Sequence, residues 1–258
     1  MAHEFDGKKY ETASTHQREW GKKLIAELEL NGSEQILDLG CGDGVLTSQI
    51  AELVPKGAVL GIDASQGMID AALPKERSNL HFLKMDINNL DFENKFNIVF
   101  SNAALHWVLD HQRLLQDVYR VLRNSGQIRF QFAGDGNCVN FFAVAREAMA
   151  LEEFQIYFTG FLWPWYMPSV DEYKRIVGSI GFRDVQVWGE NADRFFPDAE
   201  MMIRWIDQPS LVPFLTQIDD SAKESFRDFV VNRMIKRTIQ EDGRCFETFR
   251  RINVSATK

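Results

Sequence analysis

The chain has 258 residues, of which 45% are hydrophobic and 26% are charged, a composition typical of a globular protein with a large core. This composition excludes a disordered, low-complexity or collagen-like chain. Acidic residues outnumber basic residues by 37 to 29, which argues against binding to a nucleic-acid phosphate backbone.

Strand and helix patterns alternate along the first half of the chain. Hydrophobic periodicity predicts a first helix at 17–30. The predicted strands that follow it are 35–39, 58–62, 80–84, 96–100 and 127–132, and the predicted helices between them are 45–53, 65–73 and 111–122. This alternation predicts an α/β fold with a Rossmann-like, mostly parallel sheet that carries helices on both faces.

The pattern changes after residue 136. The predicted elements there are a helix at 139–153, an aromatic run at 154–167, a helix at 170–180, a strand at 182–188, mainly helical residues at 198–240 and a closing strand at 247–256. Together with the first half, these give a seven-stranded sheet. We therefore predict a single domain over 1–258. It has a ligand-binding core at 17–135, an aromatic lid and a helical substrate cap within 136–246, and a closing strand at 247–256.

The cysteines and the N-terminus bear on the cellular compartment. The three cysteines are widely separated, so they predict neither a zinc site nor a disulfide framework. The N-terminal residues have no apolar signal segment, and no uncharged apolar run approaches the roughly 20 residues that span a bilayer. We expect a cytoplasmic protein without a membrane partner or a metal, and we predict no oligomeric state.

Chemistry-bearing residues follow the predicted parallel strands, where open α/β sheets bind their ligands. The glycines of the loop 40–44 allow a tight turn and a close approach of a ligand to the backbone. Asp63 follows the second strand and can accept hydrogen bonds from two ribose hydroxyls. Nicotinamide dinucleotide folds use an acidic residue in the same way, so these features alone leave two cofactors open.

The glycine spacing separates the two cofactors. A dinucleotide fingerprint is GxGxxG, whereas Val45 stands three residues after Gly42 here. The acidic Asp43 also fits poorly against a pyrophosphate, and Asp38 suits the ammonium of an amino acid. With Asp86 for an adenine amino group, these residues describe a site for S-adenosylmethionine.

The motifs DLGCGDG (38–44), GIDAS (61–65), MDI (85–87) and FNIVFSNAALHWV (96–108) resemble those of the class I S-adenosylmethionine-dependent methyltransferases. The resemblance implies S-adenosylmethionine as cofactor and S-adenosylhomocysteine as product. The cofactor-binding residues that it implies are Gln17, Asp38, Gly40, Cys41, Gly42, Gly44, Asp63, Ala64, Met68, Asp86, Ile87, Asn102 and Ala103.

A narrower resemblance concerns the acceptor. Five features resemble trans-aconitate methyltransferases: the spacing Tyr10-x6-Gln17 and the segments SNAALHWVLDHQRLL (101–115), FPDAEMMIRWI (196–206), VPFL (212–215) and DGRCFETFRRINVSATK (242–258). Juvenile hormone acid methyltransferases share Gln17 and the triplet LHW at 105–107. Both families methylate carboxylates, so the resemblance implies a small-molecule carboxylate as acceptor. The aromatic run 154–167 departs from what a small tricarboxylate site requires and favours, as an alternative, O-, N- or C-methylation of an apolar metabolite.

A carboxylate is ionised at pH 7, so its methylation requires alignment and desolvation but no general base. The positioning candidates are Tyr10, Gln17, His106 and Trp107. Arginine binds carboxylates bidentately and aromatic rings wall a pocket, so the substrate-binding candidates are Trp107, Arg129, Trp163, Trp165, Tyr166, Arg204 and Arg244. A non-catalytic S-adenosylmethionine-binding protein and a nicotinamide dehydrogenase are further alternatives. Nucleic acid is not expected as a substrate, because no Asn/Asp-Pro-Pro-aromatic motif follows the fourth strand.

Overall fold

A computed structural model describes residues 15–258 of the chain. The chain forms two compact units. The core unit comprises the described residues up to 135 together with 165–190 and 251–258, and the helical unit comprises 136–164 and 191–250. Residues 165–190 lie within the range that the sequence assigned to the cap, but they belong to the core unit. The single-domain assignment stays a prediction.

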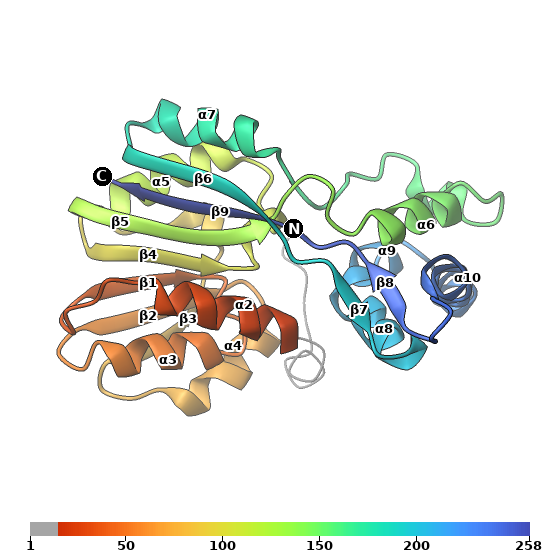
Figure 1. The fold of residues 1–258 in the computed structure, drawn as a ribbon, viewed down its shortest axis with the longest axis horizontal. Helices are drawn as coiled ribbons and strands as arrows, with labels where there is room; N and C mark the ends of the chain where they lie inside the picture. Colours follow the sequence, from red (N-terminus) through yellow and green to blue (C-terminus); the bar gives the residue numbers. More distant parts are fainter. Residues whose placement is uncertain (1–14) are drawn as a thin grey trace. The chain divides into compact units, whose positions relative to one another are not determined.

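Within the described residues, one seven-stranded sheet forms the centre of the core unit (Figure 1). Its strands are β1 (Gln35–Leu39), β2 (Ala58–Asp63), β3 (Leu80–Lys84), β4 (Phe96–Asn102), β5 (Leu122–Ala133), β6 (Arg183–Asn191) and β9 (Arg250–Thr257). Their order is β3-β2-β1-β4-β5-β9-β6. The strand pairs from β3 to β5 are parallel, and β9 is antiparallel to β5. The predicted α/β fold is confirmed.

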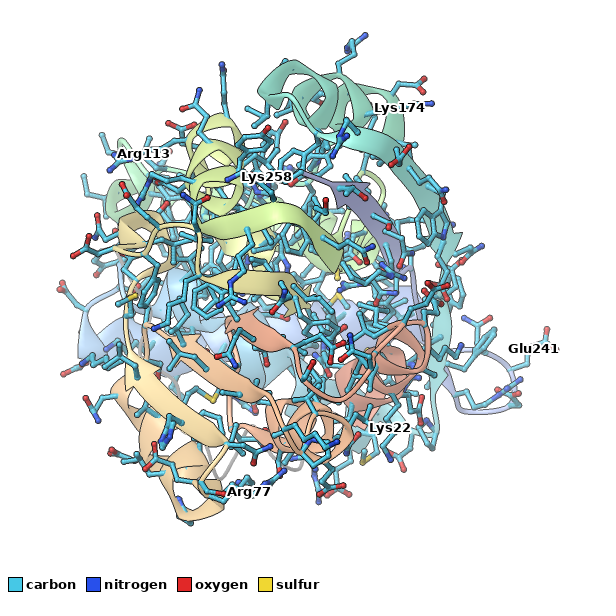
Figure 2. All side chains as sticks on the ribbon, turned by 90° about the vertical axis from the view of Figure 1, so that its left-hand side faces the viewer. Lys22, Arg77, Arg113, Lys174, Glu241 and Lys258 are labelled. Atoms are coloured by element: carbon cyan, nitrogen blue, oxygen red, sulfur yellow. The ribbon has the colours of Figure 1, made fainter. Side chains whose placement is uncertain are left out.

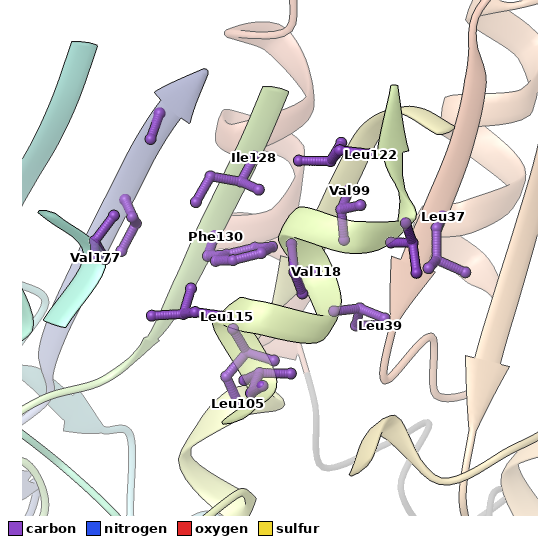
Figure 3. Packing of buried hydrophobic residues seen from close by; sticks show 14 of the residues in the cluster. Leu37, Leu39, Val99, Leu105, Leu115, Val118, Leu122, Ile128, Phe130 and Val177 are labelled. Carbon is purple, nitrogen blue, oxygen red and sulfur yellow. The ribbon is translucent and has the colours of Figure 1, made fainter. Parts of the chain in front are cut away.

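Helices cover both faces of this sheet, because successive strand residues point to opposite faces and both sets are apolar. Leu37 and Val99 pack with α5 (His111–Val121) and α7 (Val170–Ile180). Figure 3 shows Leu115 and Val118 of α5 against the strand residues of this cluster. The residues of the opposite face form a second cluster with α2 (Thr15–Ala26), α3 (Val45–Leu53) and α4 (Gln66–Ala72).

The ends of these helices follow local sequence rules. Ser65, a predicted cap, accepts a hydrogen bond from the backbone N–H of Met68 at the start of α4. Gly181 ends α7 in the left-handed conformation. Charged side chains lie on the outer surface of the unit, where Figure 2 shows Lys22, Arg113 and Lys174. Short 3₁₀ turns connect other elements, namely η1 (Leu73–Lys75), η2 (Ile87–Asn89) and η3 (Leu105–Trp107).

The helical unit has its own aromatic core. Its elements are α6 (Val139–Met149), η4 (Gln155–Phe158), β7 (Arg194–Phe196), α8 (Ala199–Trp205), η5 (Ile206–Ser210), α9 (Val212–Leu215), α10 (Asp220–Thr238) and β8 (Cys245–Glu247). The buried rings of Phe141, Phe214 and Phe226 pack together. Buried Glu247 accepts hydrogen bonds from backbone N–H groups in the first turn of α6, and burial raises the pKa of its carboxyl.

The helices predicted at 17–30 and 139–153 end earlier, at Ala26 and Met149, and two predicted strands also differ from the structure. The strand predicted at 127–132 begins earlier, at Leu122, with a register shift opposite Phe96. The closing strand predicted at 247–256 is two strands: Glu247 ends β8, which pairs with β7, and β9 begins at Arg250. The ladder is interrupted between them because side chains accept the backbone N–H groups of Phe249 and Arg250. The periodicity of the sequence does not indicate these hydrogen bonds, because they join residues far apart in the chain.

Among the described residues, none of the helices combines the length and the apolar character that a membrane span requires. The cytoplasmic location stays a prediction.

Candidate active site

The glycine loop lies at the carboxyl end of β1 and has left-handed backbone at each glycine. The φ angles are 73° at Gly40, 55° at Gly42 and 75° at Gly44. A Cβ at Gly40 would lie 2.2 Å from the Cβ of Ala104, whereas a Cβ at Gly42 would meet no atom within 4 Å. Gly40 is therefore needed for packing, and the backbone at Gly42 faces open space that a ligand can fill.

Asp38 lies beneath this loop and is 2% exposed. Its carboxylate accepts a hydrogen bond of 2.7 Å from the Thr47 hydroxyl. Burial raises the pKa of Asp38 to about 7, and the negative charge of Asp63 adds to the rise against the effect of the Thr47 hydrogen bond. A cation in the pocket would favour the ionised form of Asp38. Burial also raises the pKa of Cys41, so its thiol is not a nucleophile at neutral pH.

The acids at the carboxyl ends of β2 and β3 accept hydrogen bonds from the backbone: Asp63 is the last residue of β2, and Asp86 follows β3. Asp63 accepts hydrogen bonds from the backbone N–H groups of Gly42, at 3.0 Å, and Ser65, at 2.9 Å. Asp86 accepts from the backbone N–H of Asn88. Of the neighbouring predicted residues, Met68 is buried in α4, and Ala64 and Ile87 are half-buried.

A pocket opens between the glycine loop and α2. Its lining residues are Gln17, Arg18, Asp38, Gly40, Cys41, Gly42, Asp43, Leu46, Phe100 and Asn102. The Asn102 amide donates to the backbone carbonyl of Gln17 at 2.9 Å. The buried side-chain oxygens of Gln17 and Asn102 have no hydrogen-bond partner within residues 15–258. Such oxygens fit a ligand that carries hydrogen-bond donors. Ala103, next to Asn102, has a positive φ of 57°.

The positioning candidates after β4 lie beside two aromatic residues of the predicted lid. The rings of Trp107 and Trp165 are 5.2 Å apart, and the backbone N–H of Tyr166 donates to the His106 carbonyl. The Tyr166 hydroxyl donates to Glu172 at 2.7 Å, and burial together with this contact raises the pKa of Tyr166. Burial lowers the pKa of His106 well below its usual value, and the charge of Arg251 lowers it further. The His106 imidazole is therefore neutral at pH 7.

The aromatic run 154–167 does not lie in one unit. Trp165 and Tyr166 belong to the core unit, whereas Trp163 belongs to the helical unit. There the Trp163 ring packs on Phe142 at 5.2 Å and under the guanidinium of Arg146 at 4.6 Å. The unit boundary at Pro164 divides the run that the sequence suggested as a single lid.

The predicted arginines have different surroundings. Arg129 is buried and forms an ion pair of 2.6 Å with Glu27, which follows α2. Arg204 and Arg244, in the helical unit, are exposed and pair with acids on their own segments, Glu200 at 2.6 Å and Asp242 at 2.7 Å. Tyr10 lies outside the described residues. Its role and those of the arginines stay predictions.

Two functional candidates escaped the sequence analysis. Arg18 of α2 lines the pocket and pairs with Asp43 at 2.6 Å. Arg251, the second residue of β9, is 4% exposed and lies over the ring of Trp20 at 4.5 Å. Arg18 could have been found from its neighbour Gln17, and Arg251 from its place in the basic segment 221–258, at the start of the closing strand.

Comparisons with known proteins show the family of this chain. A family model described as a methyltransferase domain matches residues 36–126. A trans-aconitate 2-methyltransferase of Deinococcus radiodurans is 31% identical over 199 residues, which cover 75% of this chain and 76% of that protein. An uncharacterised methyltransferase of Schizosaccharomyces pombe is 28% identical over 271 residues, covering 98% of each chain.

Fold, site and relatives together define the class: the chain belongs to the class I S-adenosylmethionine-dependent methyltransferases, and S-adenosylmethionine is its cofactor. Within that class it resembles the trans-aconitate 2-methyltransferases. The alternatives of a nicotinamide dehydrogenase and of a non-catalytic binding protein are therefore not supported.

Solved structures share the fold. Phosphoethanolamine N-methyltransferase 2 of Haemonchus contortus, in complex with S-adenosylmethionine, matches with a TM-score of 0.62 at 19% identity. The match covers 98% of this chain but 56% of that longer chain. At this identity the likeness shows the fold alone.

Proposed function

We propose that this methyltransferase transfers the methyl group of S-adenosylmethionine to a carboxylate oxygen of a small-molecule acid. The observation that carries the proposal is a buried guanidinium at the carboxyl edge of the sheet. Arg251 pairs in the β ladder with Ala133, the last residue of β5, so it lies at the edge where ligands bind. A guanidinium recognises a carboxylate bidentately, and burial strengthens that interaction.

His106 supports the same acceptor. It follows β4 at the same edge, close enough to Arg251 for that charge to lower its pKa, and its Nδ1 is buried without a hydrogen-bond partner in the described residues. In the tautomer that carries the proton on Nδ1, the neutral ring can donate to a carboxylate oxygen. His106 and Arg251 would thus orient the acid together, and Trp107 and Trp165 would exclude water from it.

The cofactor site is proposed from the residues of the glycine loop and the strands beside it. Gly40, Gly42 and Gly44, with Asp38, would surround the methionine part, and Asp63 would bind the ribose. The remaining proposed cofactor contacts are Gln17, Cys41, Ala64, Met68, Asp86, Ile87, Asn102 and Ala103. When bound, the cofactor supplies a methyl group activated by its sulfonium charge.

No residue needs to remove a proton from the acceptor, since a carboxylic acid with a pKa near 4 is already ionised at pH 7. The protein would accelerate the reaction by alignment, which can contribute on the order of 7–11 kcal/mol for well-oriented reactants. The neutral state of His106 supports a role in orientation. Gln17, which lines the pocket from α2, would align the cofactor.

An apolar acceptor is the second candidate, and the adjacent rings of Trp107 and Trp165 favour it. These rings present an apolar surface near the carboxyl edge. The two candidates differ in what Arg251 does, because an apolar acceptor without a carboxylate would leave that guanidinium without a role in binding.

The deciding experiment is transfer of isotope-labelled methyl to trans-aconitate, run beside a medium-chain fatty acid and an apolar alcohol. Base-labile label on an acid would support carboxyl methylation, and label on the alcohol alone would contradict it. Arg251→Met should raise KM for the methylated acid on the order of 10- to 100-fold, because a hydrogen-bonded charge pair is lost.

The control for that variant is the affinity for S-adenosylhomocysteine, which Arg251→Met should leave unchanged within about twofold. Arg251→Lys keeps the charge but not the planar fork of the guanidinium. Its KM for the acid should therefore lie between those of the wild-type protein and Arg251→Met. Equal losses of acceptor and cofactor binding in Arg251→Met would show a structural role and would remove the main support for the carboxylate.

A further inference from the structure

The pocket between α2 and the glycine loop carries charges of both signs. Its acidic lining residues are Asp38, which is 2% exposed, and Asp43, which is 9% exposed. Among the described lining residues, Arg18 is the basic one. Its guanidinium contacts the Oδ2 atom of Asp43 at 2.6 Å, and its side chain is 26% exposed. The guanidinium of Arg18 therefore lies at the pocket, in contact with Asp43.

The acceptor atoms of this pocket suit an ammonium group. The unpartnered oxygens of Gln17 and Asn102 and the carboxylate of Asp38 all accept hydrogen bonds. The methionine part of the cofactor carries an ammonium, but it also carries a carboxylate. Acidic groups and carbonyl oxygens repel a carboxylate, and partial burial strengthens this repulsion.

Arg18 supplies the charge that such a carboxylate requires. A guanidinium has five N–H donors in a planar fork, so it can bind two carboxylates at once. One of them is the side chain of Asp43, which also accepts the backbone N–H of Val45 at 3.3 Å and is thereby tied to the start of α3. Asp43 thus orients the guanidinium and keeps it at the loop.

We propose that Arg18 binds the carboxylate of the cofactor's methionine moiety, with Asp43 as the residue that positions it. The inference rests on the proposed cofactor site. In that site, two neighbouring residues of α2 would bind the two charged groups of the methionine moiety: Gln17 would bind the ammonium and Arg18 the carboxylate. The ion pair also joins α2 to the glycine loop, so cofactor binding would stabilise the first turns of α2.

The test compares two ligands that differ only in the carboxylate, S-adenosylmethionine and its decarboxylated form, by calorimetric titration. The wild-type protein should bind S-adenosylmethionine at least tenfold more tightly than the decarboxylated form. Arg18→Met should abolish this preference and should bind the decarboxylated ligand about as well as the wild-type protein does. A preference that survives in Arg18→Met would overturn the proposal, as would equal binding of both ligands by the wild-type protein.

Asp43→Asn is the matched control. It removes the charge of Asp43 but keeps Arg18 and an oxygen that can accept from it, so it should weaken the preference for the carboxylate without abolishing it. An Asp43→Asn variant that loses the preference as fully as Arg18→Met would assign the effect to the ion pair and contradict direct binding. Thermal unfolding without ligand checks that all proteins fold. Because no acceptor is present, a failure of trans-aconitate methylation would leave this result unaffected.

Discussion

At the scale of single residues, burial brings the pKa of Asp38 close to neutrality, so the charge of this carboxyl can respond to a ligand. Its pKa is raised to about 7, so the ligand-free protein at a pH of about 6 holds this carboxyl mostly protonated. A positively charged ligand favours the carboxylate. Burial is the main cause of this raised pKa; the hydrogen bond from Thr47 of α3 lowers the pKa, and the negative charge of Asp63 in β2 raises it further.

Affinity for S-adenosylmethionine should therefore rise with pH and level off above about 7. Below that value each pH unit should weaken binding by about tenfold, because binding must release the proton of Asp38. Titrations in buffers of different ionisation enthalpy should detect the released proton. Asp38→Asn keeps an acceptor for Thr47 but cannot ionise, so its affinity should be lower and nearly independent of pH between about 5.5 and about 8. An unchanged pH dependence in this variant would assign the proton elsewhere.

The same residue affects the stability of the ligand-free protein with a defined sign. Since the folded pKa of Asp38 lies above its unfolded value, the folded state binds the proton more strongly. This contribution is fully present below the unfolded pKa and is lost as pH rises to about 7. Asp38→Asn should thus raise the melting temperature at a pH of about 8 more than at a pH of about 5.

At the scale of elements, two glycines of the glycine loop serve different purposes: Gly40 allows close packing, and Gly42 leaves space for a ligand. Gly40 has no room for a side chain because Ala104 lies against it, and Gly42 has room but faces the pocket. The loop is held by hydrogen bonds from Gly40 and Cys41 to the carbonyl of Ile62 in β2. The contact with β2 thus fixes the shape of the loop, and the shape of the loop leaves the space that a ligand can fill.

Gly42→Ala should lower the free energy of unfolding by about 1–2 kcal/mol, the cost of a left-handed backbone for a residue with a side chain. It should weaken S-adenosylhomocysteine binding by more than about tenfold, because the methyl group occupies ligand space. Gly40→Ala should destabilise the fold more than this. The measurements are denaturant unfolding and calorimetric titration.

Gly243→Ala provides the matched control, because Gly243 also has a positive φ, 84°, and open space around it, but lies in the turn between α10 and β8. It should show the stability loss without the binding loss. Comparable binding losses in Gly42→Ala and Gly243→Ala would refute a cofactor contact at Gly42.

At the scale of the whole molecule, the core unit and the helical unit are stabilised by separate sets of buried side chains. Phe130 lies in the cluster beneath α5, and Phe214 lies among the rings of the helical unit, with its centroid 5.5 Å from that of the Phe161 ring. Both are fully buried. Proposed cofactor contacts lie in the core unit, so the two units should respond differently to core substitutions.

Phe214→Leu and Phe130→Leu should each cost roughly 1–3 kcal/mol, the usual range for a change in a packed core. In hydrogen exchange, Phe214→Leu should lower protection mainly in 136–164 and 191–250 and should leave S-adenosylhomocysteine affinity nearly unchanged. Phe130→Leu should lower protection in the core unit. An equal loss across both units in each variant would indicate that they unfold as one cooperative domain.

The sheet and the class of cofactor follow from the amino-acid sequence alone. Strand and helix periodicity is local, and parallel strands bring their carboxyl ends to one edge, so the order of elements along the chain suffices to place Asp38, Asp63 and Asp86 at that edge. The GxGxG spacing distinguishes S-adenosylmethionine from a nicotinamide dinucleotide, whose fingerprint is GxGxxG. This signal is also local, because adjacent residues determine the shape of the turn.

In contrast, the tertiary structure decides which of the arginines lie near the proposed site and which pair with acids elsewhere. Arg129 pairs with Glu27, 102 residues away, whereas Arg204 and Arg244 pair with close neighbours, and none of these contacts changes the local pattern of apolar residues. The aromatic run is likewise divided at Pro164 by packing in two units. Partners far apart in the chain are brought together by long-range packing, which periodicity does not report, and so Arg18 and Arg251 are recognisable only in the folded protein.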